Sequence, residues 1–327
     1  MAVYILKRLG FMVVVFFIVT MMLFLIFKAV PVDPVNLWLA DTGANVKPEQ
    51  YEQMRQQVIS QLRLDQPLAI QYVYWISNLI SGNMGYSGFH KAPVRQVVSS
   101  PIRATVKMNI VNLVLVFIIS IPLGIRSAVK RGKAFDNSVQ VVTILGYSLP
   151  TFITCILAIW LLAVKIPLFE MGGMATPNLK GSWLTLELDK IKYMILPLIV
   201  MTFTSLGGLT RYIRAAMIEA LSLDCVRTAR AKGLKEKVVI YSHAMRNGQI
   251  TVITALTNWF IGIFGGSLMI ENLFLWNGMG RVMFMSVRNN DWAVVFAMSM
   301  FYVLIALVGH LFVDLIYAAA DPRIRLT

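Results

Sequence analysis

The hydrophobic pattern of this chain consists of six long apolar runs separated by polar segments. The runs cover residues 9–27, 108–125, 139–164, 193–209, 250–270 and 292–317. A helix needs about 20 apolar residues to cross the roughly 30 Å of hydrocarbon in a bilayer, and the runs have about this length. The pattern therefore predicts an all-α integral membrane protein with six transmembrane helices.

Proline and polar residues interrupt some of these runs. Pro122, Pro150 and Pro197 each lack a backbone donor, so we expect kinks at these positions. One face of the fifth run carries a polar or small residue at every third or fourth position. Packing through small residues and lining of a translocation path are both open readings of that face. The candidates for the path are Thr251, Thr254, Asn258, Ser267 and Met269.

A polar insert, residues 31–101, separates the first two runs and is expected on the extracytoplasmic side. Its first predicted helix begins at Pro48 and places Tyr51, Met54, Val58 and Leu62 on one stripe. A second helix is predicted over residues 67–80, followed by a turn at 81–88 that is rich in glycine and asparagine. This helical cap either docks an external partner or packs as a lid on the membrane helices.

Composition and charge agree with a membrane protein and indicate its orientation. Of the 327 residues, 57% are hydrophobic and 14% are charged, and the net charge is +14. With both termini in the cytoplasm, the inner segments hold 16 of the 30 lysines and arginines, as the positive-inside rule requires. The charge is thereby explained by topology without a nucleic acid partner. The first run lacks a cleavage site and is interpreted as a retained helix.

Catalytic and metal-binding patterns are missing from the sequence. The three histidines, His90, His243 and His310, are far apart, and no Cys/His cluster or H-E-x-x-H motif suits a metal. Cys155 and Cys225 imply no disulfide framework. His310 and Asp314 could form an intramembrane pair, either as a proton relay or as a structural hydrogen bond. The chain also lacks a phosphate-binding loop, so any ATP that drives it must be hydrolysed by another polypeptide.

A strongly basic segment, DCVRTARAKGLKEK at residues 224–237, lies between the fourth and fifth runs. We expect a helix over residues 210–231, a break at Gly233 and a second short helix over residues 235–246. Near the break, the apolar residues are Leu221, Val226, Ala229 and Ala231, and the cations around them are Arg227, Arg230, Lys232 and Lys235. The segment is either a rigid contact for a partner or a solvated loop that sets topology.

Several motifs resemble those of a known family. DCVRTARAKGL, followed by HAMRN, resembles the cytoplasmic EAA loop of binding-protein-dependent ABC importer permeases, in its oligopeptide and dipeptide branch. LISGNMGYS (79–87), SLPTF (148–152), IENLFLWNGMGR (270–281) and DPRIR (321–325) are similar to further signatures of that branch and follow in the same order. The general loop motif has Glu-Ala-Ala where this chain has Arg227, Thr228 and Ala229, and Leu-Pro where it has Met245 and Arg246.

The resemblance implies the type I ABC importer permease fold with six transmembrane helices and a helical extracytoplasmic insert. The expected division is a first transmembrane helix (1–30), the insert (31–101), a five-helix core (102–318) with a cytoplasmic coupling loop at about 211–247, and a cytoplasmic tail (319–327). The expected coupling residues are Arg227, Thr228, Ala229, Arg230, Ala231, Lys232, Gly233, Leu234 and Lys235.

The resemblance also implies the partners and the place of this chain. It would be a non-catalytic permease subunit in the bacterial inner membrane, paired with a homologous permease, two ABC ATPases that bind ATP and Mg²⁺, and an extracytoplasmic solute-binding protein. The implied substrate is an oligopeptide or dipeptide; nickel, haem and oligosaccharide are alternatives within the same architecture. An ATP-independent secondary transporter is the rival, and it predicts inverted repeats that the sequence does not display.

Overall fold

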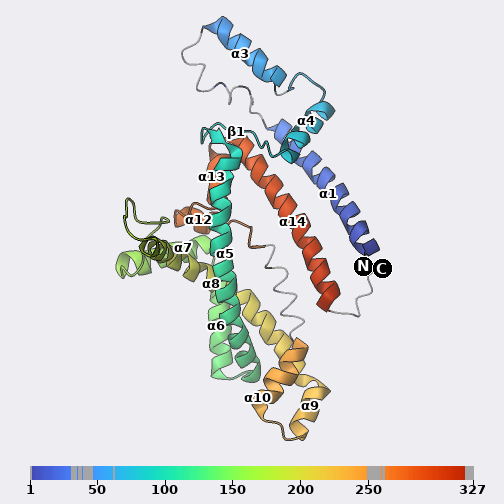
Figure 1. The fold of residues 1–327 in the computed structure, drawn as a ribbon. Coiled ribbons are helices and arrows are strands. Elements are labelled where there is room, and N and C mark those ends of the chain that lie inside the picture. The colour runs from blue at the N-terminus through green and yellow to red at the C-terminus, as the bar shows by residue number, and fades with distance from the viewer. Residues whose placement is uncertain are drawn as a thin grey trace. The chain divides into compact units, whose positions relative to one another are not determined.

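The computed structural model describes residues 2–30, 35, 39, 47–61, 63–248, 259 and 262–320. Nearly all of the regular structure in these residues is helical (Figure 1). The helices are α1 (Ala2–Ala29), α3 (Pro48–Gln61), α4 (Leu68–Ile80), α5 (Val94–Val129), α6 (Ala134–Ser148), α7 (Thr151–Ile159), α8 (Trp183–Ser222), α9 (Asp224–Ala231), α10 (Glu236–Val238), α12 (Leu268–Leu273), α13 (Met279–Arg288) and α14 (Trp292–Ala320). Two π-helical segments, η2 (Trp160–Lys165) and η3 (Val239–Ala244), extend α7 and α10, and β1 (Tyr86–Ser87) pairs antiparallel with β2 (Ala92–Pro93).

Four described helices, α1, α5, α8 and α14, are long and apolar enough to cross a membrane. They correspond to the first, second, fourth and sixth apolar runs. The fifth run falls largely outside the described residues, so its expected helix is not described. The all-α membrane fold is confirmed for the described part of the chain.

The third run differs from the expected single helix with a kink. The segments Ala134–Ser148 and Thr151–Lys165 meet at an angle of 103° and form either a broken span or a re-entrant loop. Leu149 has the extended backbone (ψ 129°) that a following proline favours, and Pro150 supplies no N–H to continue the helix. By contrast, α5 and α8 continue through Pro122 and Pro197.

The chain forms two compact units, and the first comprises residues 1–102 and 282–308. In this unit α4 packs on α1: the hydroxyl groups of Tyr72 and Thr20 are 2.7 Å apart, and the rings of Tyr72 and Phe24 meet edge to face. The predicted stripe on α3 is confirmed for Val58, which is buried with Tyr51 and Met54 packed around it. The insert therefore has its own small apolar core.

The predicted turn after α4 is also part of the first unit. Gly82 and Gly85 have φ values of 81° and 86°, in the region that favours glycine. The hydroxyl group of Ser87 donates to the buried carboxylate of Asp291 and accepts a hydrogen bond from the backbone N–H of His90 at 2.9 Å. This buried polar contact holds β1 against the turn that precedes α14.

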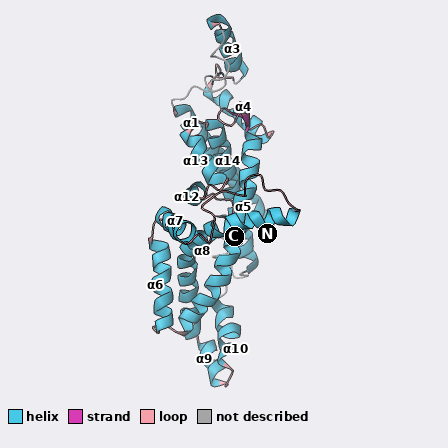
Figure 2. Cartoon of the chain, turned by 90° about the vertical axis from the view of Figure 1, so that its left-hand side faces the viewer, coloured by secondary structure: helices cyan, strands magenta, loops and turns pink. Residues whose placement is uncertain are grey.

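The second unit comprises residues 103–281 and 309–327 and is built around α8. Helix α6 lies along α8, and glycines allow their backbones to touch (Figure 2). A Cβ on Gly207 would lie 2.4 Å from the carbonyl oxygen of Thr143, and a Cβ on Gly146 would lie 2.6 Å from that of Phe203. Small residues allow this kind of approach between membrane helices.

An ion pair joins the same two helices. The carboxylate of Asp136 is fully buried and accepts two hydrogen bonds of 2.7 Å from the guanidinium group of Arg214. It also accepts one from the backbone N–H of Gly132 at 2.9 Å. Because a buried charge is tolerated only when it is paired and hydrogen-bonded, this ion pair fixes how α6 and α8 align.

Replacement of Gly207 by alanine should destabilise the protein, since the new methyl group has no room against α6. Overpacking of this kind costs about 1–3 kcal/mol, and the apparent Tm of the detergent-purified protein should fall by several degrees. Gly208→Ala is the matched control, because a Cβ at the neighbouring position meets nothing within 4 Å. Equal Tm values for the two variants would contradict this account of the α6–α8 contact.

Candidate functional site

The basic segment forms an elbow at one end of the second unit, beyond the end of α8 (Figures 1 and 2). We use the name elbow for residues 223–244, which contain α9, α10 and η3. The prediction of one helix over residues 210–231 is wrong at one point: α8 ends at Ser222 and α9 begins at Asp224. Leu223 between them is extended (ψ 146°), and its carbonyl accepts from the N–H groups of Val226 and Arg227.

The predicted break at Gly233 is confirmed, and its geometry is a Schellman motif. Gly233 has φ +72°. Its N–H donates to the carbonyl of Arg230 at 2.9 Å, and the N–H of Leu234 donates to that of Ala229 at 3.4 Å. These two bonds satisfy carbonyls that the helix end leaves open, and glycine is favoured at this position because it carries no Cβ. The chain can thus reverse sharply between α9 and α10.

The inner face of the elbow is apolar and packs on α8. Val226 and Ala229 are buried together with Val239, Ile240 and Ala244, in one cluster with Met217 and Ala220 of α8. Of the apolar residues that the sequence singled out, Leu221 packs against this cluster and Ala231 is exposed. Ala229 is therefore buried within its own chain, whereas Ala231 is accessible to a partner.

The outer face of the elbow carries the rest of the expected coupling residues. Arg227, Thr228, Arg230, Ala231, Lys232, Gly233, Leu234 and Lys235 are all exposed. Apolar side chains also lie on this surface: Leu234, Val238 and Tyr241 are 41%, 40% and 48% exposed. The elbow therefore presents cations beside exposed apolar groups, a combination that suits a protein partner.

The arginines of the elbow already have partners within the chain. Arg230 donates to the carboxylate of Glu236 at 2.7 and 3.3 Å, which ties α9 to α10 across the Gly233 turn. This hydrogen bond lowers the pKa of Glu236. Arg227 lies 3.6 Å from Asp224. Lys232, Lys235 and Lys237 form no ion pair with any described residue and are all exposed, so these three lysines are the cations of the elbow left for a partner.

The residues predicted to line a path are only partly described. Thr251, Thr254 and Asn258 lie outside the described residues. Ser267 is half-buried at the start of α12, where its carbonyl accepts from the N–H of Glu271, and Met269 is 46% exposed. Their role in a path stays a prediction.

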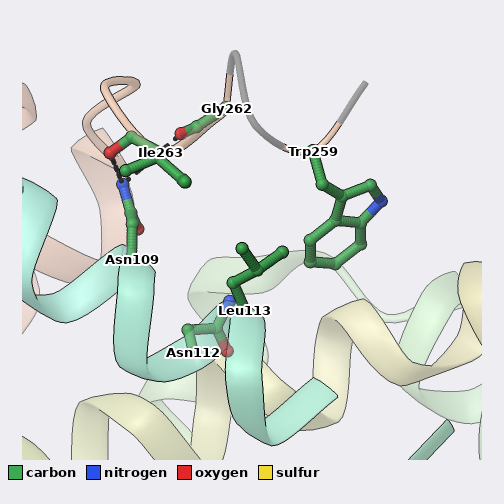
Figure 3. A pocket seen from close by; sticks show the side chains of 6 residues that line it. All are labelled: Asn109, Asn112, Leu113, Trp259, Gly262 and Ile263. Atoms are coloured by element: carbon green, nitrogen blue, oxygen red, sulfur yellow. Dashed lines mark hydrogen bonds between the residues drawn. The ribbon is translucent and has the colours of Figure 1, made fainter. Parts of the chain in front are cut away.

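A pocket in the second unit that contains two asparagines was not found from the sequence. Its volume is about 320 Å³, and its lining residues are Asn109, Asn112, Leu113, Trp259, Gly262 and Ile263 (Figure 3). The amide group of Asn109 on α5 donates to the carbonyls of Ile263 and Gly265, both at 2.8 Å. The only sequence signal for this site was a pair of asparagines three residues apart at the start of the second apolar run.

Glu271 is a second polar residue that the sequence did not single out. Its side chain is fully buried and accepts from the hydroxyl of Thr105 at 2.8 Å and from the N–H of Arg281 at 3.1 Å. The Thr105 hydroxyl also accepts from the N–H of Met279, and a Cβ on Gly278 would lie 2.5 Å from the carboxylate. The carboxylate thus fastens the loop after α12 to α5 and explains the glycine in that loop.

Comparison with known proteins agrees with this architecture. Residues 120–326 match the family described as "Binding-protein-dependent transport system inner membrane component", and residues 1–109 match its N-terminal counterpart. The chain resembles a subunit of the MetNI methionine ABC transporter, solved in inward-facing conformations, with a TM-score of 0.50 and 17% identity over 68% of this chain and 97% of that one. The described helices thus define a multi-pass membrane permease of the type I ABC importer fold.

Relatives of similar length identify the family. The chain is 33% identical to the oligopeptide transport system permease protein AppB of Bacillus subtilis (strain 168), over 99% of this chain and 100% of that protein. It is 30% identical to the dipeptide transport system permease protein DppB of Escherichia coli (strain K12), over 98% of each. The chain belongs to the binding-protein-dependent transport permeases and is an ABC importer permease, a family that implies ATPase and substrate-binding partners.

Replacement of Gly233 by valine should loosen the elbow, because the left-handed backbone costs a residue with a Cβ about 1–2 kcal/mol. A Cβ there meets nothing within 4 Å, so backbone strain is the only term. Hydrogen exchange at amides 229–236 should become roughly 5 to 30 times faster.

Gly132→Val is the matched control for this prediction. Gly132 has φ +75° and equally open surroundings in another turn, so the variant carries the same strain. It should leave exchange in the elbow unchanged. Slow, wild-type exchange at residues 229–236 in Gly233→Val would show that the turn does not need glycine.

Proposed function

We propose that this chain is one of two homologous permease subunits of an ATP-driven importer for oligopeptides or dipeptides in the bacterial inner membrane. The observation that carries the proposal is similarity over nearly the whole chain to permeases named for oligopeptide and dipeptide transport. Each permease would form half of the translocation path. A solute-binding protein would deliver the peptide on the extracytoplasmic side, and two ATPases would bind ATP and Mg²⁺ on the cytoplasmic side.

We infer that the elbow is the coupling contact with an ATPase. Its inner face packs on α8 through buried Val226 and Ala229. A displacement of α9 by the ATPase is therefore transmitted directly to a transmembrane helix. Its outer face offers Lys232, Lys235 and exposed Leu234 to a groove on the partner. ATP binding would draw the two elbows of the permease pair together, and hydrolysis would release them. This orientation places both termini in the cytoplasm.

The functional test is reconstitution of the permease pair, ATPases and binding protein in liposomes. The peptide-loaded binding protein should stimulate ATP hydrolysis and drive peptide into the vesicles. Stimulation only by a binding protein loaded with nickel, haem or oligosaccharide would overturn the substrate while leaving the architecture. Failure of the permease to co-purify with ATPases from native membranes would overturn the architecture itself.

Charge reversal on the elbow tests the coupling role. Lys232→Glu should reduce peptide-stimulated ATP hydrolysis and uptake by about tenfold or more, because a lost charged contact is worth about 1.5–3 kcal/mol. Membrane insertion, measured by the amount of protein in the membrane fraction, should stay normal. Wild-type uptake by Lys232→Glu together with wild-type uptake by Gly233→Val would argue strongly against the elbow as the coupling contact.

The Arg230–Glu236 pair supplies a control for effects inside the elbow. Arg230→Glu alone breaks the internal ion pair, whereas Arg230→Glu combined with Glu236→Arg restores a pair of reversed polarity. Recovery of peptide uptake in the double variant would show that Arg230 acts by stabilising the turn at Gly233. Loss in both variants would indicate that the ATPase reads the charge at position 230.

A further inference from the structure

The pocket on α5 contains a buried amide group with an unused hydrogen-bond donor. Asn112 is only 6% exposed, and its Oδ1 accepts from the hydroxyl of Thr202 on α8 at 3.2 Å. Its Nδ2 donates to no described residue. Because Asn112 lines the pocket and its Oδ1 is already held by Thr202, the Nδ2 is available to donate to a ligand that supplies an acceptor there.

Asn109 lies one helical turn away in the same wall of the pocket (Figure 3). Residues three apart are neighbours on a helix surface. The Asn109 amide nitrogen is occupied by the carbonyls of Ile263 and Gly265, which fixes the orientation of the group. Its Oδ1 accepts no hydrogen bond from the described residues. The two asparagines therefore place one free donor and one free acceptor one helical turn apart in the lining of the pocket (Figure 3).

The rest of the pocket is apolar and large enough for a small ligand. Leu113, Ile263 and the indole ring of Trp259 form its apolar walls. Its volume of about 320 Å³ lies at the lower end of the range for ligand sites, about 300–1,000 Å³. No charged side chain is among the residues that line it, so it offers no particular attraction to an ionic group.

We propose that Asn112 and Asn109 form a subsite for the peptide bond itself. The Asn112 amide donates to the peptide carbonyl, the Asn109 Oδ1 accepts from the peptide N–H, and the apolar walls contact side chains. A secondary amide offers both an acceptor and a donor, and every peptide bond except one that precedes proline is such a group. This subsite rests on the proposed peptide import and adds the chemical group that the path recognises.

Such a site also fits the demands of transport. Two neutral hydrogen bonds are modest interactions. They replace the hydrogen bonds that the peptide group loses when it leaves water, but they are weak enough for the peptide to dissociate again. Recognition of the backbone leaves the choice of side chains to the binding protein. Bulky and polar residues can then pass the same point.

Dialanine uptake by the reconstituted complex tests the subsite. Asn112→Leu removes the donor and should lower the initial rate about threefold to tenfold, the worth of one hydrogen bond. Asn112→Leu combined with Thr202→Val removes the Thr202 hydroxyl that would otherwise lose its acceptor, and it should show the same loss with an unchanged Tm. Ser120→Ala is the matched control: Ser120 is buried on the same helix, has no partner among described residues and does not line the pocket.

A change in the substrate tests Asn109 without disturbing the contacts of its amide group. Alanyl-lactate has an ester oxygen in place of the peptide N–H and leaves the Asn109 Oδ1 without a donor. After the binding protein is shown to bind both compounds, the wild-type complex should import the ester about threefold to tenfold more slowly than dialanine. Asn112→Leu should reduce the difference in rate between dialanine and the ester, because the contacts of Asn112 and Asn109 are made to the same peptide bond.

The outcomes separate the subsite from the importer. If the wild-type complex imports dialanine and Asn112→Leu does so at the same rate, or if the wild-type complex does not discriminate the ester, the subsite is wrong and peptide import stands. If the wild-type complex imports no peptide, the proposed function fails and the subsite fails with it. A loss in Ser120→Ala equal to that in Asn112→Leu would assign the effect to α5 packing and overturn the subsite.

Discussion

The backbone contact between α6 and α8 is the constraint on which the second unit depends. Two glycines, Gly146 and Gly207, allow the helices to approach until carbonyl oxygens of one occupy the space of a side chain on the other. The buried Asp136–Arg214 ion pair adds a directional lock between the same helices. Because α8 runs from Trp183 to Ser222 and leads directly into the elbow, anything that fixes α8 also fixes where the elbow stands.

The elbow itself is braced before any partner binds. Its turn is closed by backbone hydrogen bonds at Gly233, its inner face is buried on α8, and Arg230 and Glu236 join its two arms. Such rigidity suits a segment that transmits a displacement from one protein to another, because a flexible loop would deform and transmit less of the motion. The internal pairing of the arginines also changes which side chains are available outside: the lysines and Leu234, with the arginines serving the turn.

Polar groups inside the second unit divide into those that are satisfied and those that are not. Glu271 is surrounded by donors and holds the loop after α12 on α5. Asn112 has a donor without an acceptor among the described residues. The first arrangement is a structural fastening, whereas the second leaves interaction energy available for a ligand. Other buried polar groups of the second unit also lack a partner in the part of the chain that the structure describes, such as the Ser120 hydroxyl, but Asn112 lies in a pocket wall where a ligand can reach it.

The sequence by itself determined the class of the protein, the two helices of the insert, the turn at residues 81–88 and the break at Gly233. These features depend on local patterns: apolar length, the 3.6-residue period, and glycine where the backbone becomes left-handed. Tertiary structure decided the 103° bend after Ser148, the break at Leu223, the inward placement of Ala229 and the roles of Asn112 and Glu271. Asn112 meets Thr202 across 90 residues, and Glu271 meets Thr105 across 166. No local pattern encodes which polar groups will meet at such separations, because helix packing alone brings them together and determines which are left without a partner.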